Sequence, residues 1–353
     1  MHKRYFAVPA LLASAALVLS SCASEPADDP SSSDLTIVAT TTQMADFTRN
    51  VVGDAGGVSL TQLIQPNQSA HSFDPSAADL TALGSADVLV INGVGLEEWL
   101  DDAIDASGFD GLTIDASHLV TVLGSTAGTE EADHGADEDG ADEHSADEDS
   151  TDDHSTDEHT AATDGDPHIW TDVSNAELIV SAIEEGLADA SPAHAASFEA
   201  NATTYSAKLA ALDDWIRTNV DTVPAAERLL VSNHDALGYY TAAYGITYVG
   251  AVIPSFDDNA EPSAAAMDTL VAAIKATGVQ AVFSEASLSP KTADTIAGEA
   301  GVTVYSGEDA LYVDSLGPEG SAGDTYLKAQ LHNSTLIAES WGVTPTAVPV
   351  DLQ

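Results

Sequence analysis

LTIVAT at residues 35–40 is the stretch that decides the fold, because it is short, apolar and rich in β-branched side chains. A run of this kind predicts a buried strand. Residues 42–52 follow it with helical spacing, since Met44, Phe47 and Val51 recur at intervals of three and four. A strand that leads directly into an amphipathic helix is the repeating unit of a parallel sheet covered by helices.

The same alternation continues along the chain in two series, one on each side of an acidic segment. Further strands are expected at residues 59–64, 87–92, 112–115, 228–232, 246–252, 280–284 and 302–305. Further helices are expected at residues 76–83, 96–104, 175–187, 192–220, 235–244, 262–277, 291–300 and 326–341. We therefore predict an α/β fold, with two (β/α) domains that contain parallel sheets and are joined by one long connecting helix.

The expected domain boundaries follow from these series. The N-terminal α/β domain is expected at residues 35–190 and the C-terminal α/β domain at residues 224–353. Residues 191–223 form the predicted connecting helix, which carries one apolar stripe and ends at a proline.

The N-terminus predicts export and lipid attachment. A short basic region precedes the apolar residues 5–19, and Leu-Ser-Ser-Cys closes the segment at Cys22. This end resembles a bacterial lipoprotein processing site, so we expect a signal peptide at residues 1–21, lipid on Cys22 and a flexible tether at residues 22–34. The alternative is an ordinary signal peptide with an incidental cysteine. Cys22 is the only cysteine, so no disulfide can form within the chain.

An acidic, histidine-containing repeat interrupts the first domain at residues 125–165. It reads HGADEDGADE from His134 and HSADEDSTDD from His144, and then breaks off at His154 and His159. Almost nothing in it is apolar, so we expect a disordered loop. Imidazoles and carboxylates bind divalent cations such as zinc, so these four histidines are candidates for metal capture. The alternative is a solvated insertion with no role in transport.

The formal net charge is −49. Such a charge excludes a nucleic-acid binder and a polybasic membrane contact, so any membrane attachment is through the lipid only. We expect the protein to be a monomer.

Four candidate metal ligands lie where loops meet regular elements. They are His71 in HSFDP, His168 in DPHIW, His234 in SNHDALGYY and Asp314 in YVDSLG. All except His168 follow a predicted strand, and ligands bind at the carboxyl ends of strands in open α/β sheets. Their spacing matches neither a zinc finger nor an HExxH helix, so spacing alone favours ordinary surface or core histidines.

Other histidines and carboxylates of the chain have different expected roles. We expect His118, His194 and His332 to be surface or packing histidines. Asp166 and Asp235 are candidates for orienting the neighbouring imidazoles. Glu285 is expected to make structural hydrogen bonds, with a role as acceptor for a ligand imidazole as the alternative.

A family resemblance joins these segments. In order along the chain they read TIVATTTQMADFTRNVVGD from Thr36, AHSFDPSAADLTAL from Ala70, INGVGLEEWLD from Ile91, DPHIWTD from Asp166, SNHDALGYYTAAYGI from Ser232 and FSEASLSPKTADTIAGEAGV from Phe283. The set resembles the solute-binding lipoproteins of zinc and manganese ABC transporters. The resemblance implies a metal held between two domains by His71, His168, His234 and Asp314. Manganese-type members often carry glutamate in place of His234, and the acidic His-rich loop is a feature of zinc-type members.

The resemblance implies an extracytoplasmic zinc-binding component of an ABC importer, anchored by lipid to the outer face of a bacterial cell membrane. It would deliver Zn²⁺ to a permease that works with a cytoplasmic ATPase. Three imidazoles and one carboxylate suit zinc, whereas manganese prefers oxygen ligands. Four protein ligands leave no open position for a catalytic water, so we expect no enzyme. The alternatives are a manganese-type binding protein of the same family and a metal-binding adhesin lipoprotein.

Overall fold

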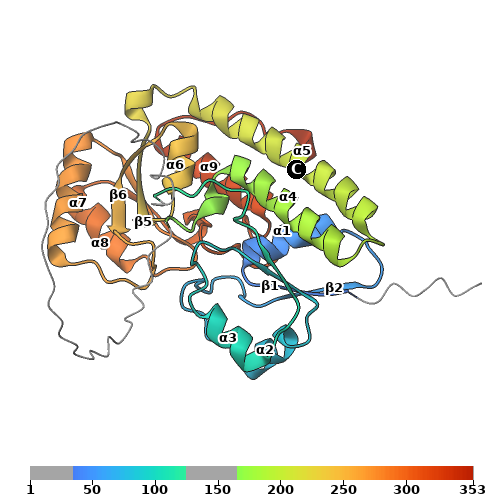
Figure 1. Cartoon of the computed structure of the whole chain (residues 1–353). Coiled ribbons are helices and arrows are strands. Elements are labelled where there is room, and N and C mark those ends of the chain that lie inside the picture. The colour runs from blue at the N-terminus through green and yellow to red at the C-terminus, as the bar shows by residue number, and fades with distance from the viewer. Residues whose placement is uncertain (1–34, 125–164, 353) are drawn as a thin grey trace, which may run out of the picture. The chain divides into compact units, whose positions relative to one another are not determined.

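The computed structural model describes residues 35–124 and 165–352 (Figure 1). The predicted signal peptide, the lipid-bearing Cys22, the tether and the four histidines of the acidic repeat lie outside the described residues. Among the residues that are described, no helix has the length and apolar character needed to cross a membrane.

The first half of the chain forms a four-stranded parallel sheet in the order β2-β1-β3-β4. Its strands are β1 (Leu35–Ala39), β2 (Val58–Gln62), β3 (Val88–Ile91) and β4 (Leu112–Asp115). Its helices are α1 (Thr42–Val52), α2 (Ala77–Leu83) and α3 (Leu100–Ser107). Neighbouring residues of β1 face opposite sides of the sheet: Ile37 belongs to the core that contains α1, and Val38 to the core that contains α2 and α3. Helices therefore cover both faces, as Figure 1 shows.

The second half contains two parallel strand pairs. β5 (Leu229–His234) pairs with β6 (Thr247–Ile253), and β7 (Ala281–Phe283) pairs with β8 (Thr303–Tyr305). Its helices are α6 (Gly238–Tyr244), α7 (Ala264–Thr277), α8 (Lys291–Ala300) and α9 (Tyr326–Ser340). Val231, Val252 and Val282 of the strands pack against apolar side chains of α7 and α8. The second strand–helix series thus has a buried core of its own.

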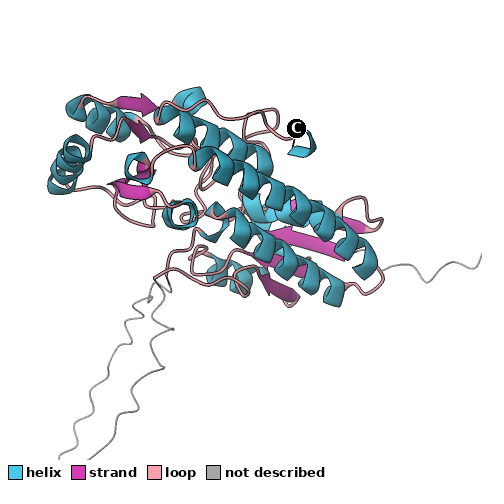
Figure 2. Cartoon of the chain, turned by 90° about the horizontal axis from the view of Figure 1, so that it is seen from above, coloured by secondary structure: helices cyan, strands magenta, loops and turns pink. Residues whose placement is uncertain are grey.

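Two long helices connect the series. α4 (Val173–Ala190) and α5 (Ala195–Val220) pack against each other and against α1, and α5 also contacts α6 and α9 (Figure 1). Seen from above, α4 and α5 cover the strands of the first sheet (Figure 2). The predicted apolar stripe of α5 is buried at Leu209, Leu212, Trp215 and Ile216. The α/β fold with parallel sheets is confirmed, whereas the domain boundaries stay a prediction.

Predicted boundaries were wrong after β3 and at the end of β5. The helix expected from residue 96 begins at Leu100, because a turn with positive φ at Gly93, Val94 and Gly95 comes first. The strand expected to end at residue 232 continues to His234, which pairs with Ile253 of β6. His234 is therefore the last residue of a strand and not part of the loop that follows it.

Candidate metal centre

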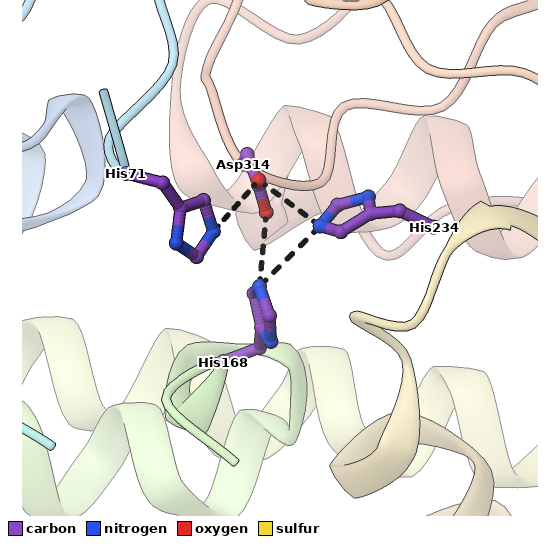
Figure 3. Close-up of side chains that lie close together, drawn as sticks. All are labelled: His71, His168, His234 and Asp314. Carbon is purple, nitrogen blue, oxygen red and sulfur yellow. Dashed lines mark hydrogen bonds and ion pairs between the residues drawn. The ribbon is translucent and has the colours of Figure 1, made fainter. Parts of the chain in front are cut away.

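Four side chains from distant parts of the chain meet at one point (Figure 3). They are His71, His168, His234 and Asp314, and one ligand atom from each lies within 4.8 Å of all the others. Three of the side chains are fully buried, and the side chain of His71 is 8% exposed. The structure therefore brings together all four residues that the sequence suggested as ligands.

Two ligands lie in loops and two lie directly at the end of a regular element. His71 lies in the loop between β2 and α2, and His168 directly precedes the short 3-10 helix Ile169–Thr171. His234 ends β5, and Asp314 lies in the loop after β8. His71, His234 and Asp314 each follow or end a strand at its carboxyl end, where ligands bind in α/β folds. Because β2, β5 and β8 belong to three different sheets, the three positions converge only through the packing of those sheets.

The distances between the ligand atoms suit a small tetrahedral cation. The His234 Nε2 atom lies 3.1 Å from Asp314 Oδ2, and the His71 Nε2 atom lies 3.4 Å from the same oxygen. The His168 Nε2 atom lies 3.5 Å from Asp314 Oδ1 and 3.4 Å from His234 Nε2. Ligand atoms about 2.0–2.1 Å from a tetrahedral ion are separated from one another by about 3.3 Å. The observed spacing is thus close to that of a zinc-sized tetrahedron.

Two carboxylates fix the orientation of two of the imidazoles. Asp166 Oδ1 lies 2.7 Å from His168 Nδ1, and Glu285 Oε1 lies 2.6 Å from His234 Nδ1. A carboxylate in this position accepts the Nδ1 proton, so the Nε2 lone pair points toward the centre. Two lone pairs that face each other across 3.4 Å repel, and a cation between them removes the repulsion.

The candidates for orienting residues have different outcomes. Asp166 has the predicted role. Glu285 has the role that we considered only as the alternative, because its carboxylate accepts from His234. Asp235, the other candidate, has its side-chain hydrogen bond with Tyr248 and not with an imidazole.

The electrostatics of the metal-free site favour positive charge. Burial would raise the pKa of Asp314, but the charges of His234 and His168 outweigh burial and hold this pKa well below its usual value. Burial would lower the pKa of His234, but the charges of Asp314 and Glu285 raise it well above its usual value. The pKa of His71 is also raised, because Asp314 outweighs the effect of burial. In the absence of metal the carboxylates therefore attract protons to the imidazoles.

Residues that the sequence analysis missed hold Asp314 in place. The backbone oxygen of Val313 accepts hydrogen bonds from Gln43 Nε2 at 2.8 Å and from Trp170 Nε1 at 3.0 Å. The backbone N–H of Leu316 donates to Thr42 Oγ1 at 2.9 Å. The first half of the chain thus holds both flanks of a ligand that belongs to the second half. No sequence signal near these residues indicates such long-range contacts.

The remaining histidines do not join the centre. His118 is exposed, His194 stacks on Phe198, and His332 Nε2 bonds to the backbone oxygen of Ala310. These three match the expectation of surface or packing histidines. The histidines of the acidic repeat lie outside the described residues.

Comparisons with known proteins identify the family and the relatives of this chain. The family described as "Zinc-uptake complex component A periplasmic" matches residues 37–340. The manganese-binding lipoprotein MntA of Halalkalibacterium halodurans is 28% identical over 90% of this chain and 92% of its own length. The zinc-binding protein TroA of Treponema pallidum is 27% identical over 86% of this chain and 87% of its own length.

Two solved structures are similar to this chain in fold. The periplasmic zinc-binding protein TroA of Treponema pallidum superposes with a TM-score of 0.71 and 25% identity, over 88% of this chain and 99% of that one. A Mn-bound mutant of a periplasmic metal-binding protein from Candidatus Liberibacter asiaticus, at 22% identity and a TM-score of 0.69, shares the fold over 86% of this chain and 99% of its own. The chain belongs to the zinc-uptake complex component A family.

Proposed function

We propose that this member of the zinc-uptake complex component A family captures Zn²⁺ outside the cell membrane and delivers it to the permease of an ABC importer. The observation that carries the proposal is the buried set of three imidazoles and one carboxylate at tetrahedral spacing. This donor set suits zinc, because manganese prefers more oxygen ligands.

The same geometry favours binding over catalysis. A catalytic zinc keeps a water in one coordination position, whereas here four protein ligands surround the centre. His168, His234 and Asp314 are closed off from solvent, so a substrate has no approach to the metal from their side. The zinc ion is therefore the cargo of this site.

Manganese is the alternative cargo. Relatives of similar identity are named for manganese in Halalkalibacterium halodurans and Streptococcus pneumoniae, and for zinc in Treponema pallidum. Zinc is favoured here because a nitrogen-rich ligand set with carboxylate-bound imidazoles matches a borderline-soft cation.

The expected location and partners follow from the same proposal. Lipid on Cys22 would hold the protein at the outer face of the membrane, next to a permease driven by a cytoplasmic ATPase. An adhesin lipoprotein of the same fold is the alternative role. Deleting the gene separates the two, because loss of growth at scarce zinc supports transport, and loss of attachment alone supports adhesion.

Metal content tests the proposal directly. We would purify the full chain without chelator and measure bound metal by native mass spectrometry for wild type, His234→Ala and His118→Ala. We expect one zinc in wild type and in the control His118→Ala, because His118 is exposed and lies outside the centre. His234→Ala should lose it. Manganese in wild type would overturn the choice of metal, and zinc retained in His234→Ala would overturn the site.

A further inference from the structure

The segment of residues 255–259 runs from the end of β6 to the loop that carries His71. At one end, the backbone N–H of Asp235 donates to the backbone oxygen of Ser255 at 3.2 Å. At the other end, the hydroxyl of Ser69 donates to Asp258 Oδ1 at 2.8 Å. The segment thus joins the residue after one ligand to a residue two positions before another.

Asp258 in this segment is a buried carboxylate with one free oxygen. It is only 5% exposed, and its Oδ1 atom accepts hydrogen bonds from Ser69 and from Asn259 Nδ2, each at 2.8 Å. Its Oδ2 atom is buried and has no hydrogen-bond partner among the described residues. A buried carboxylate oxygen without a partner costs free energy, and a cation beside it would remove that cost.

Asp258 lies on the side from which a cation can reach the centre. His71 is the one ligand of the four whose side chain is partly exposed, at 8%. Asp258 lies close to the loop that carries His71, because its Oδ1 atom accepts a hydrogen bond from Ser69, two residues before that ligand. Phe256 of the same segment packs near His168, with 6.1 Å between the ring centroids, and adds to the cover on that ligand.

We propose that Asp258 is a further metal-handling residue, a capture ligand whose free Oδ2 atom receives the incoming divalent cation at the His71 side before the four ligands of the centre surround it. The proposal rests on the proposed function. Asp258 does not belong to the set of four clustered ligand atoms, so its role is in the path of the metal and not in its final coordination. A carboxylate next to a charged site raises the local concentration of cations and the rate of association.

The rate of zinc association tests this role. We would mix the full chain with Zn²⁺ alone in a stopped-flow instrument and follow the tryptophan fluorescence, to which Trp170 contributes with its ring 5.4 Å from that of His168. Asp258→Asn keeps the size of the side chain and an oxygen for Ser69 but removes the charge. We expect its association rate constant to fall by about fivefold or more.

Four further variants separate capture by the Asp258 carboxylate from a general field effect and from a structural contact. Asp257→Asn removes the same charge from the exposed neighbour and should change the rate by less than about twofold. Ser69→Ala removes the hydrogen bond to Asp258 but keeps the charge, and should stay close to wild type. Asp258→Glu restores the charge and should recover most of the rate, which a purely structural role would not produce. Asp258→Ser, smaller and also neutral, should be as slow as Asp258→Asn and serves in its place if that variant does not fold.

An unchanged rate in the neutral variants of Asp258 would overturn the proposal. Equal slowing by Asp257→Asn would assign the effect to the general negative field, and equal slowing by Ser69→Ala would assign it to the contact between the segments. Either result would also overturn it. The zinc content of the wild-type chain is measured separately, so a chain that holds zinc but shows no effect at Asp258 contradicts the capture role alone.

Discussion

Replacing Glu285 with glutamine tests how far the zinc affinity depends on a residue that touches no metal. Glu285 is fully buried, and its Oε1 atom lies 2.6 Å from His234 Nδ1 and 3.2 Å from the backbone nitrogen of His234. Glutamine has almost the same shape but carries no charge. If its oxygen still accepts from His234, its NH₂ group takes the position of Oε2, which is buried and has no hydrogen-bond partner among the described residues.

The expected loss of zinc affinity follows from the contact between Glu285 and His234. A hydrogen bond to a charged group contributes about 1.5–3 kcal/mol. Losing the acceptor that orients a metal-bound histidine weakens metal binding by about 10–100-fold, which corresponds to about 1.4–2.7 kcal/mol. If the amide instead turns its NH₂ group toward Nδ1, the proton of the imidazole moves to Nε2 and blocks the ligand atom. We therefore expect Glu285→Gln to lose at least about tenfold in zinc affinity.

Competition with a chelating dye at fixed pH measures this loss. Glu299→Gln is the matched control, because it removes the same charge from an exposed position of α8. Thermal unfolding of the metal-free variants shows whether the fold is intact. A Glu285→Gln protein that folds and binds zinc within about threefold of wild type would refute the reasoning, since the charged acceptor would then contribute little.

Three other results follow from the geometry of the centre. Protons compete with zinc for the Nε2 atoms, so zinc affinity should fall as the pH decreases. Because the pKa values of His71 and His234 are raised, the fall should begin above the usual histidine pKa of about 6.5. A dye titration from about pH 8 to 5.5 checks this, and a flat profile contradicts coordination by neutral imidazoles. Gly238→Ala should weaken zinc binding by about tenfold, because its Cβ would lie 2.5 Å from Asp166 Oδ2 and displace the carboxylate that accepts from His168. An unchanged zinc affinity in calorimetry would show that Asp166 can move freely. His234→Glu should bind manganese poorly, because the new carboxylate would face the carboxylate of Glu285 and the two like charges repel. The double variant with Glu285→Gln should bind manganese better. Equal manganese binding by both variants, measured by calorimetry, would count against this repulsion.

Local sequence patterns were sufficient for most elements of the fold. The bounds of α1 and α8 are those expected from apolar spacing. The helix expected at residues 76–83 begins one residue later, because Ser76 is its N-cap and forms a capping box. The helix expected from residue 96 began late because a tight turn came first, and apolar periodicity does not report backbone φ. Short-range chemistry thus determines where elements lie, while positive-φ turns shift their ends.

The four ligands were found through a family resemblance, because their spacing carries no signal of its own. The orienting residues show where sequence reasoning stops. Asp166 reaches His168 from two positions away, through bonds to both its backbone N–H and its Nδ1 atom, and such a local turn can be inferred from sequence. Glu285 reaches His234 across 51 positions, and only the packing of β5 against β7, which belong to different sheets, brings them together.

The position of Asp314 depends even more on tertiary structure. The second half of the chain holds its loop up to Tyr312, where backbone N–H and C=O both bond to the side chain of Asn333. From Val313 onward the bonds come from the first half, through Gln43 and Trp170. The chain therefore passes from one half to the other within the residues next to this ligand. Asp314 is therefore fixed relative to His168, which belongs to the first half. His234 is the one imidazole whose orienting carboxylate comes from the second half, so its alignment with the other ligands depends on how the two halves pack together.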